Sequence, residues 1–187
     1  NLPLLINDLN CYPYILSVCT LEPRKNLQSV IESFLLLKES NKSFNELKLV
    51  LTGAPGWKND SIYNIYDQSV YKNDIIFTGY LNDNDLYEIY RYANAFIYPS
   101  FYEGFGLPIL EAMASGVPVV TSSNSSLTEV GGESVIYVDP FNEESICQGM
   151  NRALKDGLDF SKKGLIQAKK FSWDNSASKV QRIIENL

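Results

Sequence analysis

The alternation of short apolar segments with helical patterns is the feature that most restricts the fold of this chain. Six short segments rich in β-branched and aromatic residues recur along the sequence, and several are followed by apolar residues spaced three or four apart. Strands that alternate with helices form a parallel sheet covered on both faces. We therefore expect an α/β fold, a Rossmann-like doubly wound parallel sheet of about six strands with helices on both faces.

Glycines and prolines near the ends of these segments allow the elements to be placed. No internal repeat and no low-complexity linker divides the chain, so we expect residues 1–187 to form a single domain. The expected strands are residues 14–18, 47–52, 75–78, 95–98, 117–121 and 134–138, and the expected helices are residues 27–35, 61–71, 86–93, 108–115 and most of the chain after residue 140.

The composition excludes several classes of function. The 187 residues include 22 acidic and 16 basic side chains, a net charge of −6, which is the wrong sign for a protein whose main partner is nucleic acid. Histidine is absent from the sequence, which excludes Ser-His and Cys-His nucleophile pairs and His-ligated zinc in this chain. Chemistry in this chain must therefore depend on carboxylates, cations and backbone amides.

Cysteine usage and apolar length suggest where the protein is located. Cys11, Cys19 and Cys147 are widely separated and form no CxxC pair, which favours a reducing compartment, and we expect a cytoplasmic protein. No apolar run approaches the ~18 to 20 residues that cross a bilayer. Because the sequence begins at Asn1 and not at Met, we also expect it to be part of a longer protein.

Ligands of open α/β sheets bind beyond the carboxyl ends of the strands. Four segments that follow expected strands are therefore the candidates for a site, and all four should open onto one crevice. They are residues 20–25, 53–56, 79–81 and 100–107.

Two of these segments are suited to an anionic ligand. Gly104 and Gly106 precede a helix, where unpaired amides and the helix dipole favour an anion and the glycines allow close approach of the backbone. Arg24 and Lys25 could neutralise a diphosphate. The alternative is that the two cations are solvated surface charges; the glycine-rich helix start on the same edge favours the diphosphate.

Glu103 lies in the loop before this helix, and Glu111 lies one turn inside it. Both carboxylates can face one crevice, where they would accept hydrogen bonds from the hydroxyl groups of a sugar. Taken alone, Glu111 could instead be a solvated acid that complements the helix dipole. The occurrence of both carboxylates around GFGLPIL favours a shared sugar-binding role.

The sequence EGFGLPILE at 103–111, followed by AMASGVPVV at 112–120 and EVGG at 129–132, resembles the E-x7-E signature of retaining glycosyltransferases of family 4. The resemblance extends to EPRKNL at 22–27, to Gly53 and to GYL at 79–81, and so covers nearly the whole chain. It implies the C-terminal, donor-binding half of a GT-B fold, without the N-terminal acceptor domain. A terminal helix at 172–187 would pack towards that missing domain.

The resemblance also implies roles for matching positions. Arg24 and Lys25 would hold the diphosphate of the donor, and Glu103 would lie beside the transferred sugar; these three are the expected catalytic residues. Cys19 stands where the family usually has glycine. The expected donor-binding residues are Thr20 and Gly53 along the cleft, Tyr80 and Leu81 near the base, Gly104, Phe105, Gly106 and Leu107 against sugar and phosphate, and Glu111 on the ribose.

The implied activity is transfer of a hexose from a nucleotide sugar (GDP- or UDP-hexose) to a glycan or lipid-linked acceptor. EPRKN and ASGVPVV resemble bacterial mannosyl- and rhamnosyltransferases, which favours GDP-mannose. A nucleotide-sugar epimerase, a sugar phosphorylase and a non-catalytic nucleotide-sugar-binding module remain alternatives. The domain alone should bind donor without transferring it, and attachment to the inner membrane face is compatible with this class.

The resemblance implies that no metal and no cofactor are needed. The Asp83-Asn84-Asp85 string matches the D-x-D motif of metal-dependent glycosyltransferases of another fold. Because it precedes an expected helix, we interpret it as acidic N-cap material.

Overall fold

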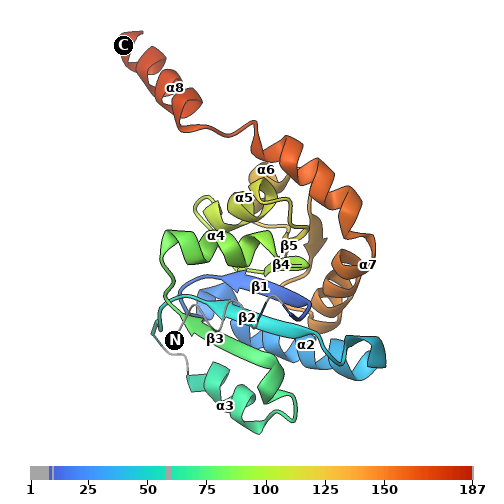
Figure 1. The fold of residues 1–187 in the computed structure, drawn as a ribbon. Coiled ribbons are helices and arrows are strands. Elements are labelled where there is room, and N and C mark those ends of the chain that lie inside the picture. Colours follow the sequence, from blue (N-terminus) through green and yellow to red (C-terminus); the bar gives the residue numbers. More distant parts are fainter. Residues whose placement is uncertain (1–8, 10, 58–59, 187) are drawn as a thin grey trace.

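The computed structural model describes residues 9, 11–57 and 60–186. Their strands form one six-stranded sheet in the order β3-β2-β1-β4-β5-β6, and every neighbouring pair is parallel (Figure 1). This order reverses direction between β1 and β4, as in a doubly wound fold. The strands are β1 (Tyr14–Val18), β2 (Lys48–Thr52), β3 (Ile75–Gly79), β4 (Ala95–Tyr98), β5 (Val119–Ser122) and β6 (Ile136–Val138).

Helices cover both faces of the sheet, because successive strand residues point to opposite sides. In β1, Ile15 packs in one core cluster with residues of α2, α3 and α7, whereas Leu16 packs in the other cluster with residues of α4, α5 and α6. The expected α/β fold is confirmed. The helices are α2 (Leu27–Ser40), α3 (Asp60–Gln68), α4 (Asp83–Arg91), α5 (Leu107–Ala114), α6 (Leu127–Gly131), α7 (Glu143–Ala168) and α8 (Trp173–Glu185), and the short 3-10 turns are η1 (Pro23–Lys25), η2 (Lys42–Phe44) and η3 (Lys72–Asp74).

Some boundaries differ from the sequence-based expectation. The fifth strand begins at Val119, two residues later than expected, because Pro118 has no N–H to donate to the sheet. The helix α3 ends at Gln68, three residues earlier than expected, and the 3-10 turn η3 follows it. The short helix α6 was not expected.

The acidic string at the start of α4 has a different role from the one expected. Asn82 is the N-cap, and its side chain accepts a hydrogen bond from the Asp85 amide. Asp83 and Asp85 lie in the first turn, where their charge complements the helix dipole.

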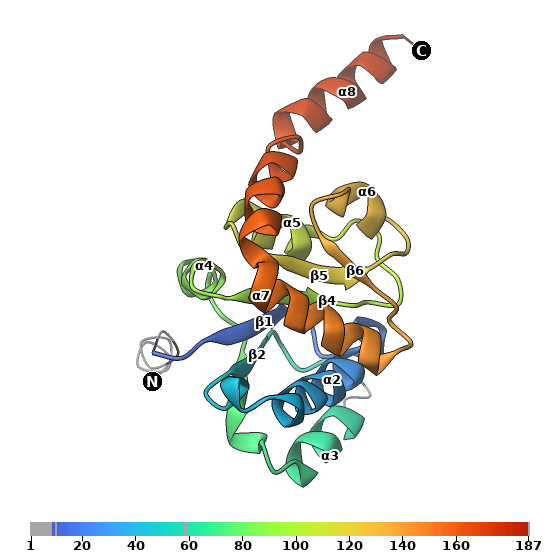
Figure 2. The same cartoon turned by 90° about the vertical axis from the view of Figure 1, so that its right-hand side faces the viewer.

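The helix α8 projects away from the body of the domain in both views (Figures 1 and 2). None of its described residues is buried. Among the described residues, we find no helix that is long and apolar enough to cross a membrane.

Candidate active site

A cavity of about 530 Å³ lies at the carboxyl edge of the sheet, where β1, β2, β3 and β4 end. The four segments predicted to share a crevice all contribute to its lining. Its residues are Val18, Cys19, Thr20, Glu22, Arg24, Lys25, Gly53, Ala54, Tyr80, Tyr98, Glu103, Phe105, Gly106, Leu107 and Pro108.

Backbone contacts hold the first two loops of the cavity together. The Cys19 amide donates to the Thr52 carbonyl at 2.9 Å, and the Leu21 amide donates to the Ala54 carbonyl at 3.1 Å. Between these contacts Gly53 has a φ of +145°, and a side chain there would overlap the carbonyl of Cys19. The glycine is therefore required for the close approach of the β1 and β2 loops.

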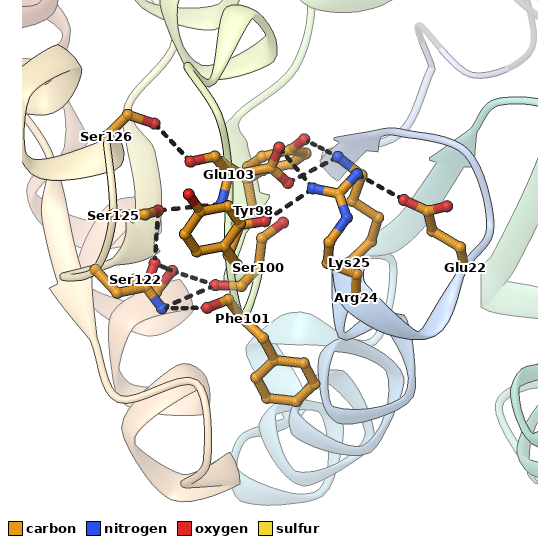
Figure 3. Close-up of polar contacts among 12 residues, drawn as sticks. Glu22, Arg24, Lys25, Tyr98, Ser100, Phe101, Glu103, Ser122, Ser125 and Ser126 are labelled. Carbon is orange, nitrogen blue, oxygen red and sulfur yellow. Dashed lines mark hydrogen bonds and ion pairs between the residues drawn. The ribbon is translucent and has the colours of Figure 1, made fainter.

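The predicted catalytic residues form one cluster of charges at the cavity (Figure 3). Glu103 Oε1 lies 2.7 Å from Lys25 Nζ, and Glu103 Oε2 lies 2.9 Å from Arg24 Nη1. Arg24 Nη2 also pairs with Glu22 Oε1 at 2.7 Å. The two cations and two carboxylates of this charge cluster cancel, so its net charge is zero.

The charge cluster differs from solvated surface charges. Lys25 is 8% exposed and Glu103 is 7% exposed, whereas Arg24 is partly exposed at the rim. Burial alone would raise the pKa of Glu103, but hydrogen bonding from Lys25 and nearby hydroxyl groups, with the charge of Lys25, outweighs burial and holds that pKa below its usual value. Glu103 is therefore an ionised carboxylate at neutral pH.

The main chain of Glu103 is fixed by the loop that joins β5 to α6. Its amide donates to Ser125 Oγ at 3.1 Å, and its carbonyl accepts from Ser126 Oγ at 3.0 Å (Figure 3). From the other side, Arg24 Nη1 donates to the Tyr102 carbonyl at 2.8 Å. Glu103 therefore lies in a loop whose backbone is fixed from both sides by hydrogen bonds.

The N-terminus of α5 faces the same cavity. Gly106 is its N-cap, with a φ of +101°, and Phe105, Leu107 and Pro108 also line the cavity. The backbone amides and the positive end of the helix dipole at this position favour an anion. The described chain therefore presents two cations and a helix start to one space.

Three predicted donor-binding residues do not line this cavity. The Leu81 side chain is buried in the core, and Gly104 is exposed beside the cavity. Glu111 is exposed on α5, and its Oε2 accepts a hydrogen bond from the Tyr90 hydroxyl at 3.0 Å. Thr20, Gly53, Tyr80, Phe105, Gly106 and Leu107 do line it.

The structure adds Tyr98 and Cys19 to the cavity. Tyr98 is the last residue of the apolar strand β4, so the sequence pattern predicts a core residue. Its polar hydroxyl, placed at the edge of the sheet where ligands bind, could have identified it as a site residue. Cys19 lines the cavity directly after β1, and burial raises the pKa of its thiol to about 12. The thiol is therefore protonated at neutral pH.

The described residues contain no cluster of three or more Cys, Asp or Glu side chains that could hold a metal ion. Asp83 and Asp85 lie on α4 and are not part of the cavity.

Comparison with known proteins shows the family to which the chain belongs. The family model described as glycosyl transferases group 1 matches residues 8–171. The chain belongs to this family. The glycosyltransferase domain is 40% identical over 165 residues to the O-antigen chain mannosyltransferase B of Escherichia coli, covering 87% of the chain and 43% of that protein. It is 34% identical over 167 residues to the serotype-specific mannosyltransferase WbdA of E. coli, covering 88% of the chain and 20% of that protein.

Solved structures agree with this fold. The domain matches sucrose-phosphate synthase of Thermosynechococcus elongatus with a TM-score of 0.84 at 22% identity, covering 99% of the chain and 48% of that protein. It matches HepE of Anabaena, solved with UDP and glucose, with a TM-score of 0.82 at 17% identity, covering 100% of the chain and 52% of that protein. The chain spans less than half the length of the curated relatives described above. The GT-B type of domain expected from the sequence is thereby confirmed.

Proposed function

We propose that this domain binds the nucleotide-sugar donor of a retaining glycosyltransferase that transfers a hexose, with GDP-mannose as the leading donor. One observation carries the proposal: Arg24, Lys25, Glu103 and the start of α5 share one cavity at the carboxyl edge of the sheet. The mannosyltransferase names of two relatives support mannose as the sugar. The acceptor in this proposal is a glycan or a lipid-linked sugar.

Each part of the cavity has a distinct task in the proposed reaction. Arg24, Lys25 and the helix start stabilise negative charge on the departing diphosphate, which is often the largest catalytic contribution. A diphosphate competes with Glu103 for the two cations, because the charge cluster is neutral without ligand. Displacement frees the Glu103 carboxylate to accept hydrogen bonds from the sugar. The cations and helix dipole supply the positive charge, so we propose a reaction without metal or cofactor.

We also propose that a further, N-terminal half of the protein supplies the acceptor site and that α8 packs against it. The exposed apolar residues Trp173, Val180, Ile183 and Ile184 lie on this projecting helix. Replacing Ile183 and Ile184 by serine should leave the melting temperature of the isolated chain unchanged and lower that of the full-length protein. Equal melting temperatures in the full-length protein would contradict this arrangement.

For location, we propose the cytoplasm, with the full-length enzyme at the inner membrane face. Cys19 and Cys147 carry free thiols, which is compatible with a reducing compartment. The name of one relative, an O-antigen chain mannosyltransferase, supports an envelope glycan as acceptor. Fractionation of cells that express the full-length protein checks this location.

Calorimetry tests the donor. The chain is titrated with GDP, UDP, GDP-mannose and UDP-glucose, and GDP and GDP-mannose should bind more tightly than the uridine compounds. In the full-length protein, Lys25→Ala should weaken donor binding and lower turnover because it removes a cation from the cavity. Glu111→Ala should weaken donor binding because it removes the carboxylate proposed to bind the ribose. The proposal is wrong if the wild-type chain binds none of the four compounds, or if both substitutions leave donor affinity and turnover unchanged.

A further inference from the structure

Tyr98 lies at the cavity, but the proposed reaction gives it no task. Its hydroxyl oxygen is 2.5 Å from Lys25 Nζ, which donates the hydrogen bond (Figure 3). The side chain is 2% exposed at the end of β4, where it is fixed by the sheet and stacked at 6.0 Å against Phe96. Packing therefore sets the position of the Tyr98 hydroxyl beside Lys25.

The two partners of Lys25 differ in charge. Glu103 is a carboxylate and competes with an anionic ligand for the ammonium, whereas the Tyr98 hydroxyl is neutral and does not. An ammonium has three protons, so Lys25 can keep its bond to Tyr98 while it donates the others to a diphosphate. Tyr98 thus remains a partner of Lys25 when Glu103 is displaced.

A fixed partner matters because a lysine side chain loses much rotamer freedom when it is ordered. Tyr98 and Glu103 together impose this cost in the free protein, before a ligand arrives, and such pre-ordering increases affinity. When a diphosphate displaces Glu103, Tyr98 is the partner that keeps Lys25 ordered. Burial, followed by the neighbouring Glu103 carboxylate, raises the pKa of Tyr98, so its hydroxyl stays neutral at physiological pH.

We propose that Tyr98 is a positioning residue that holds the Lys25 ammonium in the cavity, both in the free domain and when a diphosphate is bound. The identity of that ligand rests on the proposed function. The hold on Lys25 in the free domain does not, so it can be tested separately.

The first experiment needs no ligand. The wild-type chain and the variants Tyr98→Phe and Tyr14→Phe are treated with trace acetic anhydride, and acetylation of Lys25 is followed by mass spectrometry relative to exposed Lys162. Tyr14→Phe is the matched control, because Tyr14 is also a buried strand tyrosine, and its hydroxyl bonds to the Ile89 carbonyl at 2.8 Å. Labelling of Lys25 should rise several-fold in Tyr98→Phe alone. Equal labelling in all three proteins overturns the inference.

The second experiment compares GDP with GMP by calorimetry. Tyr98→Phe should weaken GDP binding about tenfold, as expected for a lost hydrogen bond to a charged group, and GMP binding much less. Tyr14→Phe should change neither affinity. Introduced into Lys25→Met, Tyr98→Phe should cause no further loss of GDP affinity. Equal losses for GDP and GMP, or additive losses in the double variant, overturn the inference.

Two further outcomes remain decisive. If the wild-type chain binds neither GDP nor UDP nor their sugars, the proposed function fails. The labelling experiment alone then decides whether Tyr98 holds Lys25. If Tyr98→Phe does not fold, Tyr98→Met also removes the hydroxyl while keeping an apolar side chain, and the same labelling comparison is made with it.

Discussion

Lys25 Nζ lies 2.7 Å from Glu103 Oε1, although 78 positions separate the two residues in the chain. Both side chains are buried, so the pair is shielded from solvent and its Coulomb interaction is stronger than that of a surface ion pair. The same carboxylate also binds Arg24. In the free domain Glu103 therefore occupies the two cations that we assign to the diphosphate.

Substitution of Glu103 by glutamine separates these two roles of the carboxylate. Glu103→Gln leaves the charge cluster with a net charge of +1, so GDP should bind several-fold more tightly to the isolated chain. Calorimetry measures this affinity. In the full-length protein the same variant should lose about a hundredfold in turnover, because the sugar is no longer oriented by a carboxylate. A loss of GDP affinity as large as that of Lys25→Ala would contradict the competition between Glu103 and the diphosphate.

The two glycines before α5 should respond differently to alanine. Gly106 has a positive φ, and an added Cβ would lie 2.7 Å from the buried Leu127 side chain. Gly106→Ala should therefore lower the free energy of unfolding by about 1 to 3 kcal/mol, measured by urea titration. At Gly104 a Cβ meets nothing within 4 Å, so Gly104→Ala should change stability by less than about 0.5 kcal/mol. Similar losses for both variants would exclude backbone strain as the cause.

An ion cluster at the opposite edge of the sheet should make stability depend on pH. Asp74 accepts from Lys48 at 2.5 Å and pairs with the buried Lys38 at 2.8 Å. Burial alone would raise the pKa of Asp74, but hydrogen bonds and charges of the two lysines outweigh it and hold that pKa below its usual value. The stabilisation is complete above the pKa of an aspartate in an unfolded chain, about 3.9, and is lost as pH falls through the lower folded value.

Asp74→Asn should therefore lower the free energy of unfolding by about 1 to 2 kcal/mol at neutral pH, a value reduced by the partial exposure of Asp74. Urea titrations at decreasing pH should show that this difference from wild type shrinks as the pH falls below about 3.9. Asp159→Asn is the control, because Asp159 pairs with Lys163 on an exposed helix surface and should have no measurable effect. A difference from wild type that does not change with pH would show that the Asp74 charge is not responsible.

The architecture could be predicted from the sequence because it depends on local patterns. Short β-branched runs and apolar residues at helical spacing fix which segments become strands and helices, and a glycine or proline closes several of them. The helix α6 could not be predicted in this way, because Leu127–Gly131 is too short to show a helical period. The start of β5 was also misplaced, since the apolar character of Val117 and Pro118 says nothing about hydrogen bonding in the sheet.

The loops that meet at the site could be predicted from the sequence, because the carboxyl ends of parallel strands share one edge of a sheet. The residue types there, including Arg24, Lys25 and Glu103, could be predicted as well. Three contacts could not be predicted: Glu103 binds both cations, Glu111 pairs with Tyr90 outside the cavity lining, and Tyr98 bonds to Lys25. Ion pairs and hydrogen bonds depend on ångström distances between side chains far apart in the chain, and these distances are set by the packing of the folded protein.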